Sequence, residues 1–339
     1  MNYLSVCSGI EAATVAWHHM GWKPVGFSEI EKFPSQVLAH HYPQVTNFGD
    51  MTKYKEWQID GTVGLLVGGT PCQSFSIAGL RKGLSDPRGN LALTYVGILD
   101  HFRPKWFIWE NVPGVLSSNQ GRDFAAFLTA LGIIGYGWSY RVLDAQYFGV
   151  AQRRKRVFVV GCLGDWKPAA EVLFERESLQ RNIKTGNRKG EKITTDVASS
   201  IVYENHPSDS RVREMGDVCQ TVTSSWGTGG GNIPFVQAFR KSRRAQSKTD
   251  YETWVDDGKA NTINTFDIGD IRTTHAVANQ STVRRLTEVE CERLQGFPDN
   301  YTNIRENCPS SVRYKAIGNS MAVPVMRWIG ERINNYERI

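Results

Sequence analysis

The sequence predicts an α/β protein built around a doubly wound, mostly parallel β-sheet, interrupted by a smaller and loop-rich unit. In the first half of the 339-residue chain, short apolar runs alternate with amphipathic stretches, as in sheets whose parallel strands are joined by helical crossovers. This pattern stops near residue 164, where a long segment rich in Gly, Ser, Thr and charged residues begins. Helical periodicity returns near residue 287. The chain is therefore expected to have one α/β unit interrupted by a separate module.

Each element of the α/β unit follows from the spacing of its apolar residues. Short apolar runs predict strands at residues 3–6, 25–28, 64–67, 105–109 and 157–161. Apolar residues at helical spacing predict helices at residues 10–20, 32–41, 91–102, 123–131, 287–296 and 323–334. In the first helix, Ala13, Trp17 and Met20 share one face. These elements divide the chain into residues 1–163, a middle segment at 164–282, and a return segment at 283–339.

The middle segment carries little regular periodicity. Short β-like pieces occur at residues 200–203, 219–223 and 261–266, and the glycine run at 227–232 must be a loop. Basic residues gather around Arg240 and around Arg188, where they can contact phosphates or form a solvated surface.

Composition is typical of an ordinary globular protein, with 40% hydrophobic and 22% charged residues. No apolar run is long enough to cross a bilayer, and the N-terminus does not resemble a signal peptide, so a cytoplasmic protein without a membrane partner is expected. The net charge of +6 permits a polyanionic partner. The six cysteines are scattered without zinc-ligand spacing, which predicts a reducing compartment and no metal site.

The most informative motif is GGTPC, residues 68–72, directly after the strand predicted at residues 64–67. Its glycines allow a tight turn close to a ligand, and Pro71 stiffens the backbone. Reactive groups of open α/β sheets gather at this carboxyl edge of the strands. Cys72 is therefore a candidate nucleophile, with a buried structural thiol as the alternative.

Two further motifs place charged groups at the sheet edge. Glu110 follows an apolar run and is a candidate acid or base, with a turn or helix-capping role as the alternative. In an extended segment, alternation puts Gln152, Arg154 and Arg156 on one side. These side chains would bind an anionic or carbonyl-bearing partner, unless they form a solvated edge of the sheet.

Residues at the first strand ends favour an adenosyl ligand without a pyrophosphate. Gly9 follows the first strand, but Glu11 and Ala12 stand where a dinucleotide motif would have glycines. Glu29, after the second strand, can hydrogen-bond ribose hydroxyls. Asp50 can accept a hydrogen bond from an adenine amino group.

Together and in this order, the motifs resemble the sequence blocks of the cytosine carbon-5 DNA methyltransferase family, of prokaryotic or phage type. The resemblance covers about residues 1–161 and 283–339. Its blocks are Val6-Cys7-Ser8-Gly9, Glu29, Gly49-Asp50, Gly69-Thr70-Pro71-Cys72-Gln73, Glu110-Asn111-Val112, residues 152–156, residues 285–298 and Gly318-Asn319-Ser320. The first block departs from the family pattern Phe-x-Gly-x-Gly-Gly, with Cys7, Glu11 and Ala12 in place of Phe, Gly and Gly.

The resemblance implies a Rossmann-like methyltransferase sheet, a target-recognition domain at residues 164–282, and DNA (cytosine-5-)-methyltransferase activity. A methyl group would pass from S-adenosylmethionine to carbon 5 of a cytosine flipped out of double-stranded DNA, leaving S-adenosylhomocysteine. Cys72 would bond to carbon 6 of the ring. Glu110 would hold ring nitrogen 3 and the exocyclic amine, Arg156 the ring carbonyl, and Arg154 would stabilise the developing charge.

The resemblance also implies a cofactor pocket at the ends of the first strands and against the return segment. The residues expected to form it are Cys7, Ser8, Gly9, Ile10, Glu29, Ile30, Asp50, Met51, Gly69, Pro71, Asn319 and Ser320. A monomer is expected. The segment at residues 74–89 would close over the DNA, or else be a plain surface loop. The DNA recognition sequence, and whether the enzyme is paired with a restriction enzyme, solitary or phage-borne, stay open.

Three other functions compete with this interpretation. An RNA cytosine methyltransferase could use the same site, but its nearest look-alikes have a short middle module. A non-catalytic DNA-binding regulator would be signalled by loss of Cys72 or Glu110, and both are present. A dinucleotide enzyme is disfavoured by the missing glycine pattern.

Overall fold

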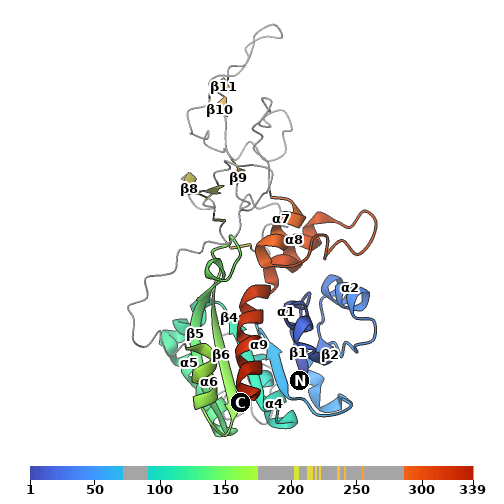
Figure 1. Ribbon diagram of the computed structural model, residues 1–339, viewed down its shortest axis with the longest axis vertical. Helices are drawn as coiled ribbons and strands as arrows, with labels where there is room; N and C mark the ends of the chain where they lie inside the picture. Colours follow the sequence, from blue (N-terminus) through green and yellow to red (C-terminus); the bar gives the residue numbers. More distant parts are fainter. Residues whose placement is uncertain are drawn as a thin grey trace.

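The computed structural model describes residues 1–71, 91–174 and 286–338, with short stretches between residues 202 and 255. A six-stranded sheet runs through it in the order β2-β1-β3-β4-β6-β5 (Figure 1). Its strands are β1 (Asn2–Val6), β2 (Lys23–Ser28), β3 (Leu65–Gly68), β4 (Trp106–Asn111), β5 (Tyr136–Asp144) and β6 (Lys155–Leu163). The first four are parallel, whereas β6 runs antiparallel to both β4 and β5. The predicted doubly wound, mostly parallel sheet is confirmed.

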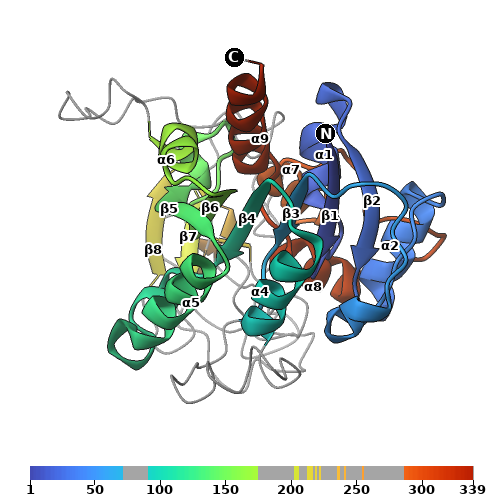
Figure 2. The same ribbon diagram turned by 90° about the horizontal axis from the view of Figure 1, so that it is seen from below.

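Helices cover both faces of the sheet (Figure 2). One face carries α4 (Leu91–Phe102) and α5 (Arg122–Ile133), and the other carries α1 (Ala12–Trp17), α6 (Lys167–Leu173) and α9 (Val323–Glu337). Successive strand residues point to opposite faces, so that Leu66 packs in one apolar cluster and Leu65 in the other. The central strands are apolar throughout because both of their faces are buried.

The return segment packs on the face of the sheet that carries α1 and α6. It contains α7 (Glu288–Gln295), α8 (Ser310–Asn319) and α9. Thr287 and Glu290 form a capping box that begins α7, and Gly296 ends it with a φ of 82°. The indole of Trp17 donates to the carbonyl of Met326, 2.8 Å away, and joins α1 to α9. The end of the chain thereby packs against the helix that follows β1.

The described parts of the middle segment form small antiparallel pairings. One sheet has the order β8-β7-β9, from β7 (Val202–Asn205), β8 (Val212–Gly216) and β9 (Phe235–Val236). The strands β10 (Arg240–Lys241) and β11 (Trp254–Val255) form another pair. Cys219 pairs directly with Gln152 next to β6. The piece expected at residues 261–266, the segment 74–89 and Cys72 lie outside the described residues.

Several boundaries differ from those expected. The predicted helix at 10–20 begins at Ala12, because Glu11 has left-handed backbone angles, and ends at Trp17 before the 3₁₀ turn η1 (His18–Met20). The strand β5 and the helices α6 and α8 were not predicted. Exposed Tyr140 and Val142 alternate with polar residues along the edge strand β5, so its apolar signal is mixed. The helix α2 (Lys32–His41) has the expected bounds.

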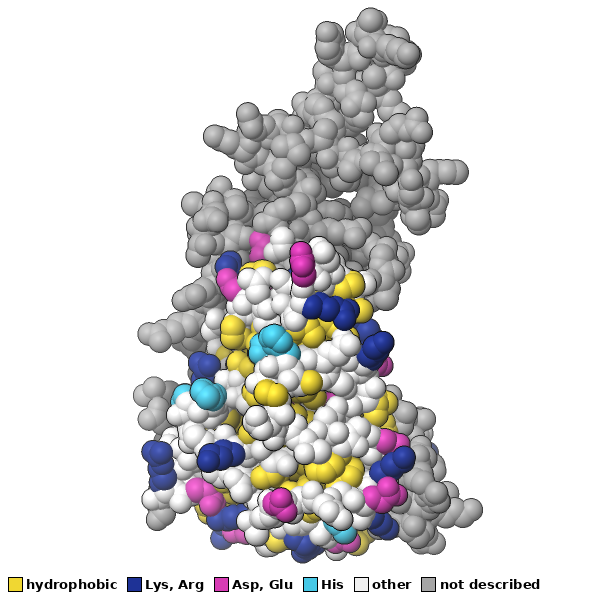
Figure 3. All heavy atoms as spheres, turned by 90° about the vertical axis from the view of Figure 1, so that its right-hand side faces the viewer, with side chains coloured by type: hydrophobic (Ala, Val, Ile, Leu, Met, Phe, Trp, Pro, Cys, Tyr) yellow, Lys and Arg dark blue, Asp and Glu magenta, His cyan; other side chains and the backbone are white. Residues whose placement is uncertain are grey.

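On the face shown in Figure 3, Lys and Arg side chains are scattered and interspersed with Asp and Glu, so the described surface there is mixed in charge. Within the described residues, no helix combines the length and apolar character needed to cross a membrane.

Candidate active site

The loop between β1 and α1 has an unusual backbone. Cys7, Gly9 and Glu11 all have positive φ values, of 48°, 57° and 64°. Two of the three are not glycine and are therefore held by their surroundings against a local preference. The amide of Gly9 donates to a carboxylate oxygen of Glu29, 2.8 Å away, and the return segment holds the loop through Tyr301, whose hydroxyl donates to the carbonyl of Ile10.

Glu29 lies at the end of β2 and is fixed from two sides. Its second carboxylate oxygen accepts from the amide of Glu31 at 2.7 Å, and its own amide donates to the side chain of Asn47. The next residue, Ile30, leaves 74% of its surface exposed, which is unusual for a large apolar side chain. An ordered acidic group beside an exposed apolar one can hold a ribose and pack against a purine ring.

Asp50 and Met51 lie next to the loop between β1 and α1. Asp50 caps the 3₁₀ helix η2 (Met51–Glu56), because its carboxylate accepts from the amide and hydroxyl of Thr52, both at 2.9 Å. Met51 is buried, and its sulfur accepts from the thiol of Cys7. Burial raises the pKa of Cys7 to about 12, so this thiol stays protonated and is a poor nucleophile.

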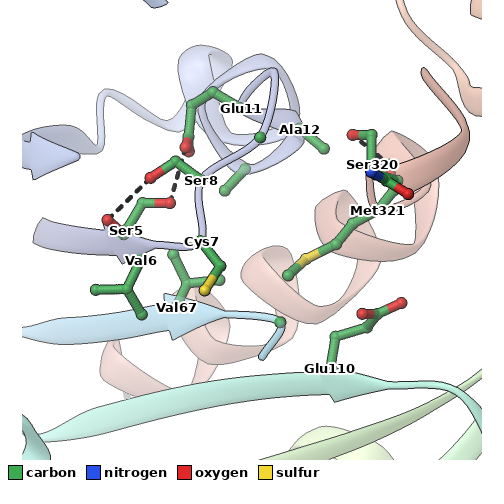
Figure 4. Close-up of a pocket in the computed structure, with 14 residues that line it drawn as sticks. Ser5, Val6, Cys7, Ser8, Glu11, Ala12, Val67, Glu110, Ser320 and Met321 are labelled. Atoms are coloured by element: carbon green, nitrogen blue, oxygen red, sulfur yellow. Dashed lines mark hydrogen bonds between the residues drawn. The ribbon is translucent and has the colours of Figure 1, made fainter. Parts of the chain in front are cut away.

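A cavity of about 40 Å³ separates this loop from β4 and the return segment. Glu11 lies on one side of it, and Met321 and Glu110 lie on the other (Figure 4). The lining residues are Ser5, Val6, Cys7, Ser8, Gly9, Glu11, Ala12, Ala13, Val67, Gly69, Glu110, Asn319, Ser320 and Met321. The cavity joins the expected cofactor side to the expected base side.

The loop that leads to Cys72 is tied to β4. The indole of Trp109 donates to the hydroxyl of Thr70 at 3.0 Å, and the amide side chain of Asn111 donates to the carbonyl of Thr70 at 2.9 Å. Gly69 passes so close to β4 that an added Cβ would lie 2.8 Å from a carboxylate oxygen of Glu110. A side chain at this position would displace the carboxyl group of Glu110. Two of the sequence motifs thus hold each other in place.

Glu110 forms an ion pair with Arg156 on the neighbouring strand β6, with 3.0 Å between its Oε1 and the Nε of Arg156. Both side chains are mostly buried, with 12% and 17% exposed. Burial raises the pKa of Glu110, and the charges of Arg156 and Arg154 oppose that rise. The carboxyl group is therefore easier to protonate than an exposed glutamate.

Arg154 has a different environment from Arg156. It is almost fully buried, and its terminal nitrogens donate to the carbonyls of Val222, Gly318 and Ser320. Its Nε has no partner among the described residues. Burial, followed by the charge of Arg156, lowers its pKa to about 9. Arg154 therefore joins β6, the middle segment and the return segment.

Gln152 also connects the first half of the chain to the middle segment and to the return segment. Its side chain is fully buried, donates to the carbonyl of Leu294 at 2.7 Å and accepts from the amide of Val222 at 2.7 Å. Arg153 and Lys155 are exposed, whereas Gln152 and Arg154 are buried. Buried and exposed side chains therefore alternate along this segment, as the sequence predicts.

The structure brings together about half of the expected cofactor residues. Those that line the cavity are Cys7, Ser8, Gly9, Gly69, Asn319 and Ser320. Ile10, Glu29, Ile30, Asp50, Met51 and Pro71 do not line it, although Glu29 and Met51 are bonded to residues that do. Sequence reasoning missed Ser5, Met321 and the lining role of Glu11. Of these three residues, only Glu11 stood out in the sequence, because it departs from the family's glycine pattern. No cluster of metal-binding side chains occurs within the described ranges.

Comparisons with known proteins identify the family of the chain. The family model described as C-5 cytosine-specific DNA methylase matches residues 1–335. The chain is 35% identical to a protein of Escherichia phage P1 named DNA N-6-adenine-methyltransferase, over 98% of this chain and 61% of that protein. It is 26% identical to the orphan methyltransferase M.SPRI of Bacillus phage SPR, over 99% of this chain and 98% of that protein.

Solved structures share the fold. The Dnmt2 methyltransferase of S. pombe superposes with a TM-score of 0.64 at 17% identity, covering 100% of both chains. A DNMT2 variant of Spodoptera frugiperda gives 0.62 at 17% identity, covering 98% of this chain and 99% of that one. The chain therefore belongs to the C-5 cytosine-specific DNA methylase family.

Proposed function

We propose that this chain transfers a methyl group from S-adenosylmethionine to carbon 5 of a cytosine flipped out of duplex DNA. The observation that carries this function is the Glu110–Arg156 ion pair, whose carboxyl group lines the cavity. A carboxyl group beside a guanidinium matches the polar edge of cytosine, with the ring nitrogen and amine facing the first and the ring carbonyl facing the second. Membership of the family supports the same target base.

Cys72 activates the ring in this mechanism. Its thiolate forms a bond to carbon 6, the ring electrons move toward nitrogen 3, and carbon 5 becomes enamine-like. Cys72 itself lies outside the described residues. Its role is supported by its position directly after Pro71 in the sequence and by the anchored backbone of Thr70.

Glu110 supplies the proton that this electron movement needs. Its raised pKa favours the protonated acid, which can donate to ring nitrogen 3 while its other oxygen accepts from the exocyclic amine. Since Arg156 is its partner in the absence of DNA, the entering base would replace part of that ion pair with its own polar edge.

The two arginines act on the other side of the ring. Arg156 donates to the ring carbonyl, and the fixed positive charge of Arg154 stabilises the negative charge that develops there. After methyl transfer, the proton on carbon 5 leaves and the bond from sulfur to carbon 6 breaks, which regenerates the thiolate of Cys72. The proton on ring nitrogen 3 returns to Glu110 as the ring becomes aromatic again. Water is the proposed acceptor of that proton.

The residues around Gly9 fit S-adenosylmethionine. An added Cβ at Gly9 would meet no atom within 4 Å, so the backbone there faces open space. Ser8, Asn319 and Ser320 offer polar groups for the methionine end. Glu29 would hold the ribose, while Ile30 and Asp50 would contact the adenine. When bound, the cofactor supplies a methyl group on a positively charged sulfur.

Residues 164–282 are proposed as the target-recognition domain, with residues 1–163 and 283–339 as the catalytic unit, acting as a monomer on duplex DNA. Gln152 and Arg154 support this division, because both bind Val222 of the middle segment from the edge of the catalytic unit. Relatives are named as type II and as orphan methyltransferases, and both roles are compatible with this site.

The test is to express the chain in cells that lack their own DNA methylation and to measure modified nucleosides by mass spectrometry. We expect 5-methylcytosine in the DNA, and bisulfite sequencing then identifies the target sequence. The measurement also separates the cytosine function from the one named for the phage P1 relative. N6-methyladenine without 5-methylcytosine would contradict the proposed function, as would methyl incorporation into transfer RNA but not into duplex DNA.

A further inference from the structure

Glu11 is the residue of the cavity that departs most in chemistry from the family pattern. A carboxylate stands where the family has glycine, yet the backbone keeps the left-handed conformation that glycine favours, with a φ of 64°. Glu11 is almost fully buried and lines the cavity beside the Gly9 loop. A strained, buried acidic residue at a ligand cavity suggests a role in what the cavity binds.

The partners of Glu11 are all neutral. One carboxylate oxygen accepts from the hydroxyl of Ser5 at 2.8 Å, and the other accepts from the amide and hydroxyl of Thr14, both at 3.2 Å. The cavity lining among the described residues has no lysine or arginine, and its other carboxylate, Glu110, is already paired with Arg156. When Glu11 is ionised, its negative charge is therefore not balanced by a described cation of the lining.

The titratable groups near Glu11 on other elements are one carboxylate and three tyrosines, and burial raises the pKa of each tyrosine so that it stays neutral near pH 7. The carboxylate is Glu29, directly after β2, and the tyrosines are Tyr3 in β1, Tyr42 directly after α2 and Tyr301 in the return segment. Burial raises the pKa of Glu11 to about 7, and the nearby charge of Glu29 adds to the rise against the hydrogen bonds from Ser5 and Thr14. The charge of Glu11 thus changes near neutral pH.

We propose that Glu11 makes the cavity selective for the charged cofactor over its spent product. This inference rests on the proposed function, since it takes the cavity as the site of S-adenosylmethionine. The cofactor carries one more positive charge than S-adenosylhomocysteine, because its sulfur is a sulfonium and the product's sulfur is neutral. An ionised Glu11 attracts the first more than the second, and this limits inhibition by the product.

The expected size follows from one partly screened pair of unit charges, which changes a ratio of affinities by about tenfold. Both oxygens of Glu11 already accept hydrogen bonds, so it acts through its charge. Binding of the cofactor lowers the pKa of Glu11 and releases its proton. With a pKa of about 7 in the free protein, up to about half a proton leaves at pH 7.

A purely structural role gives a different result. Glu11 also caps α1, and if capping were its whole role, its loss would weaken both ligands equally. The ratio of the two dissociation constants is therefore the informative quantity.

The experiment is isothermal titration calorimetry on the full chain with S-adenosylmethionine and, separately, S-adenosylhomocysteine. Titrations are made at pH 6, 7 and 8 in two buffers of different ionisation enthalpy. For the wild-type chain we expect the preference for the cofactor to grow by about fivefold from pH 6 to pH 8, because cofactor binding already ionises part of Glu11 at pH 6. We also expect proton release at pH 7 with the cofactor and much less with the product.

Glu11→Gln should remove both effects, and Glu11→Gly, which restores the family residue, should do the same. Glu110→Gln is the matched control, because it removes the other carboxylate of the cavity and should keep the pH-dependent ratio. Titration of the ligands' own amino groups is common to all variants and cancels in the comparison.

Two outcomes overturn the inference in distinguishable ways. If the wild-type chain binds both ligands with a ratio independent of pH and without proton release, Glu11 is not selective, although the cofactor site stands. If neither ligand binds the wild-type chain at all, the proposed function fails together with the inference.

Discussion

Two carboxylates with little exposed surface line the same cavity from opposite sides. One is paired with a positive charge, and the other has only neutral hydrogen-bond donors. Glu110, near the end of β4, has a guanidinium 3.0 Å away, whereas Glu11, after β1, has hydroxyl and amide partners. Burial raises the pKa of both. The difference supports the ligand proposed for each side. A carboxyl group next to a guanidinium suits the neutral, polar edge of a base, and one with neutral partners suits a cation.

The two sides are also held in place differently. The base side depends on hydrogen bonds between strands, from Trp109 and Asn111 to Thr70. The cofactor side depends on the backbone conformation of Cys7, Gly9 and Glu11. Substitutions on the base side should therefore change catalysis, and those on the cofactor side should change ligand affinity.

The largest effect is expected from Cys72→Ala. Methylation should fall to below about one thousandth of the wild-type rate, because the variant cannot form the bond to carbon 6. The dissociation constant of S-adenosylmethionine should stay within about twofold, since the cavity residues are unchanged. The rate is measured as tritium transfer to duplex DNA, and the affinity by calorimetry. Near-normal methylation by this variant would contradict the proposed bond between Cys72 and carbon 6.

Glu110→Gln should have the next largest effect. The amide keeps the shape of the side chain but cannot donate the acid proton, so kcat should fall by about 10² to 10⁴. In the wild-type chain, the rate should decline as pH rises through the raised pKa of Glu110, because the protonated form is the active one. Rates are compared at saturating DNA and cofactor from pH 5.5 to 8.5. An unchanged kcat in the variant would show that Glu110 does not act as the proton donor.

Gly69→Ala tests how closely the base side is packed. The added methyl would lie 2.8 Å from a carboxylate oxygen of Glu110, so the carboxyl group must move from its position beside Arg156. We expect kcat to fall by about tenfold or more, in line with the cost of misplacing a catalytic group. Gly132→Ala is the control, because an added Cβ there meets nothing within 4 Å. Equal kcat values for the two variants would contradict the close packing.

The smallest effect on chemistry, and a clear effect on stability, is expected from Arg154→Lys. Lysine keeps the positive charge but loses the fork that reaches the carbonyls of Val222, Gly318 and Ser320. The free energy of unfolding should fall by about 2 to 3 kcal/mol. Arg156→Lys, which keeps a positive charge that can still pair with Glu110, should change it by less than about 1 kcal/mol. Urea denaturation of both variants measures the difference, and equal losses would refute the structural role of Arg154.

Much of the fold could be predicted from the sequence, because most strands and helices of the α/β unit have a clear apolar period. The helices α2 and α4 have the predicted bounds. The edge strand β5 was missed because its exposed residues include Tyr140 and Val142, which hide the alternation. The helix α8 was missed because its sequence has no clear apolar face, and it is positioned by tertiary bonds such as that from Gln295 to the carbonyl of Ile317.

The candidate site was predictable where a motif carries it and not where contacts between distant segments do. Glu110 and Arg156 were named from sequence, and the structure pairs them. The buried bonds of Arg154 to two distant segments could not be read from the spacing of residues, because the position of the carbonyls depends on the fold. Glu11 was noticed as a departure from a pattern, but its burial and its neutral partners needed coordinates.

The most direct test of the central claim is covalent trapping with 5-fluorocytosine. Duplex DNA carrying this base at the target site identified by bisulfite sequencing is incubated with the chain and S-adenosylmethionine. Fluorine cannot leave carbon 5 as a proton does, so a one-to-one complex that survives denaturation should accumulate, and peptide mass spectrometry should locate the bond at Cys72. Methylated product without any trapped complex, or a complex bonded at another cysteine, would contradict the account.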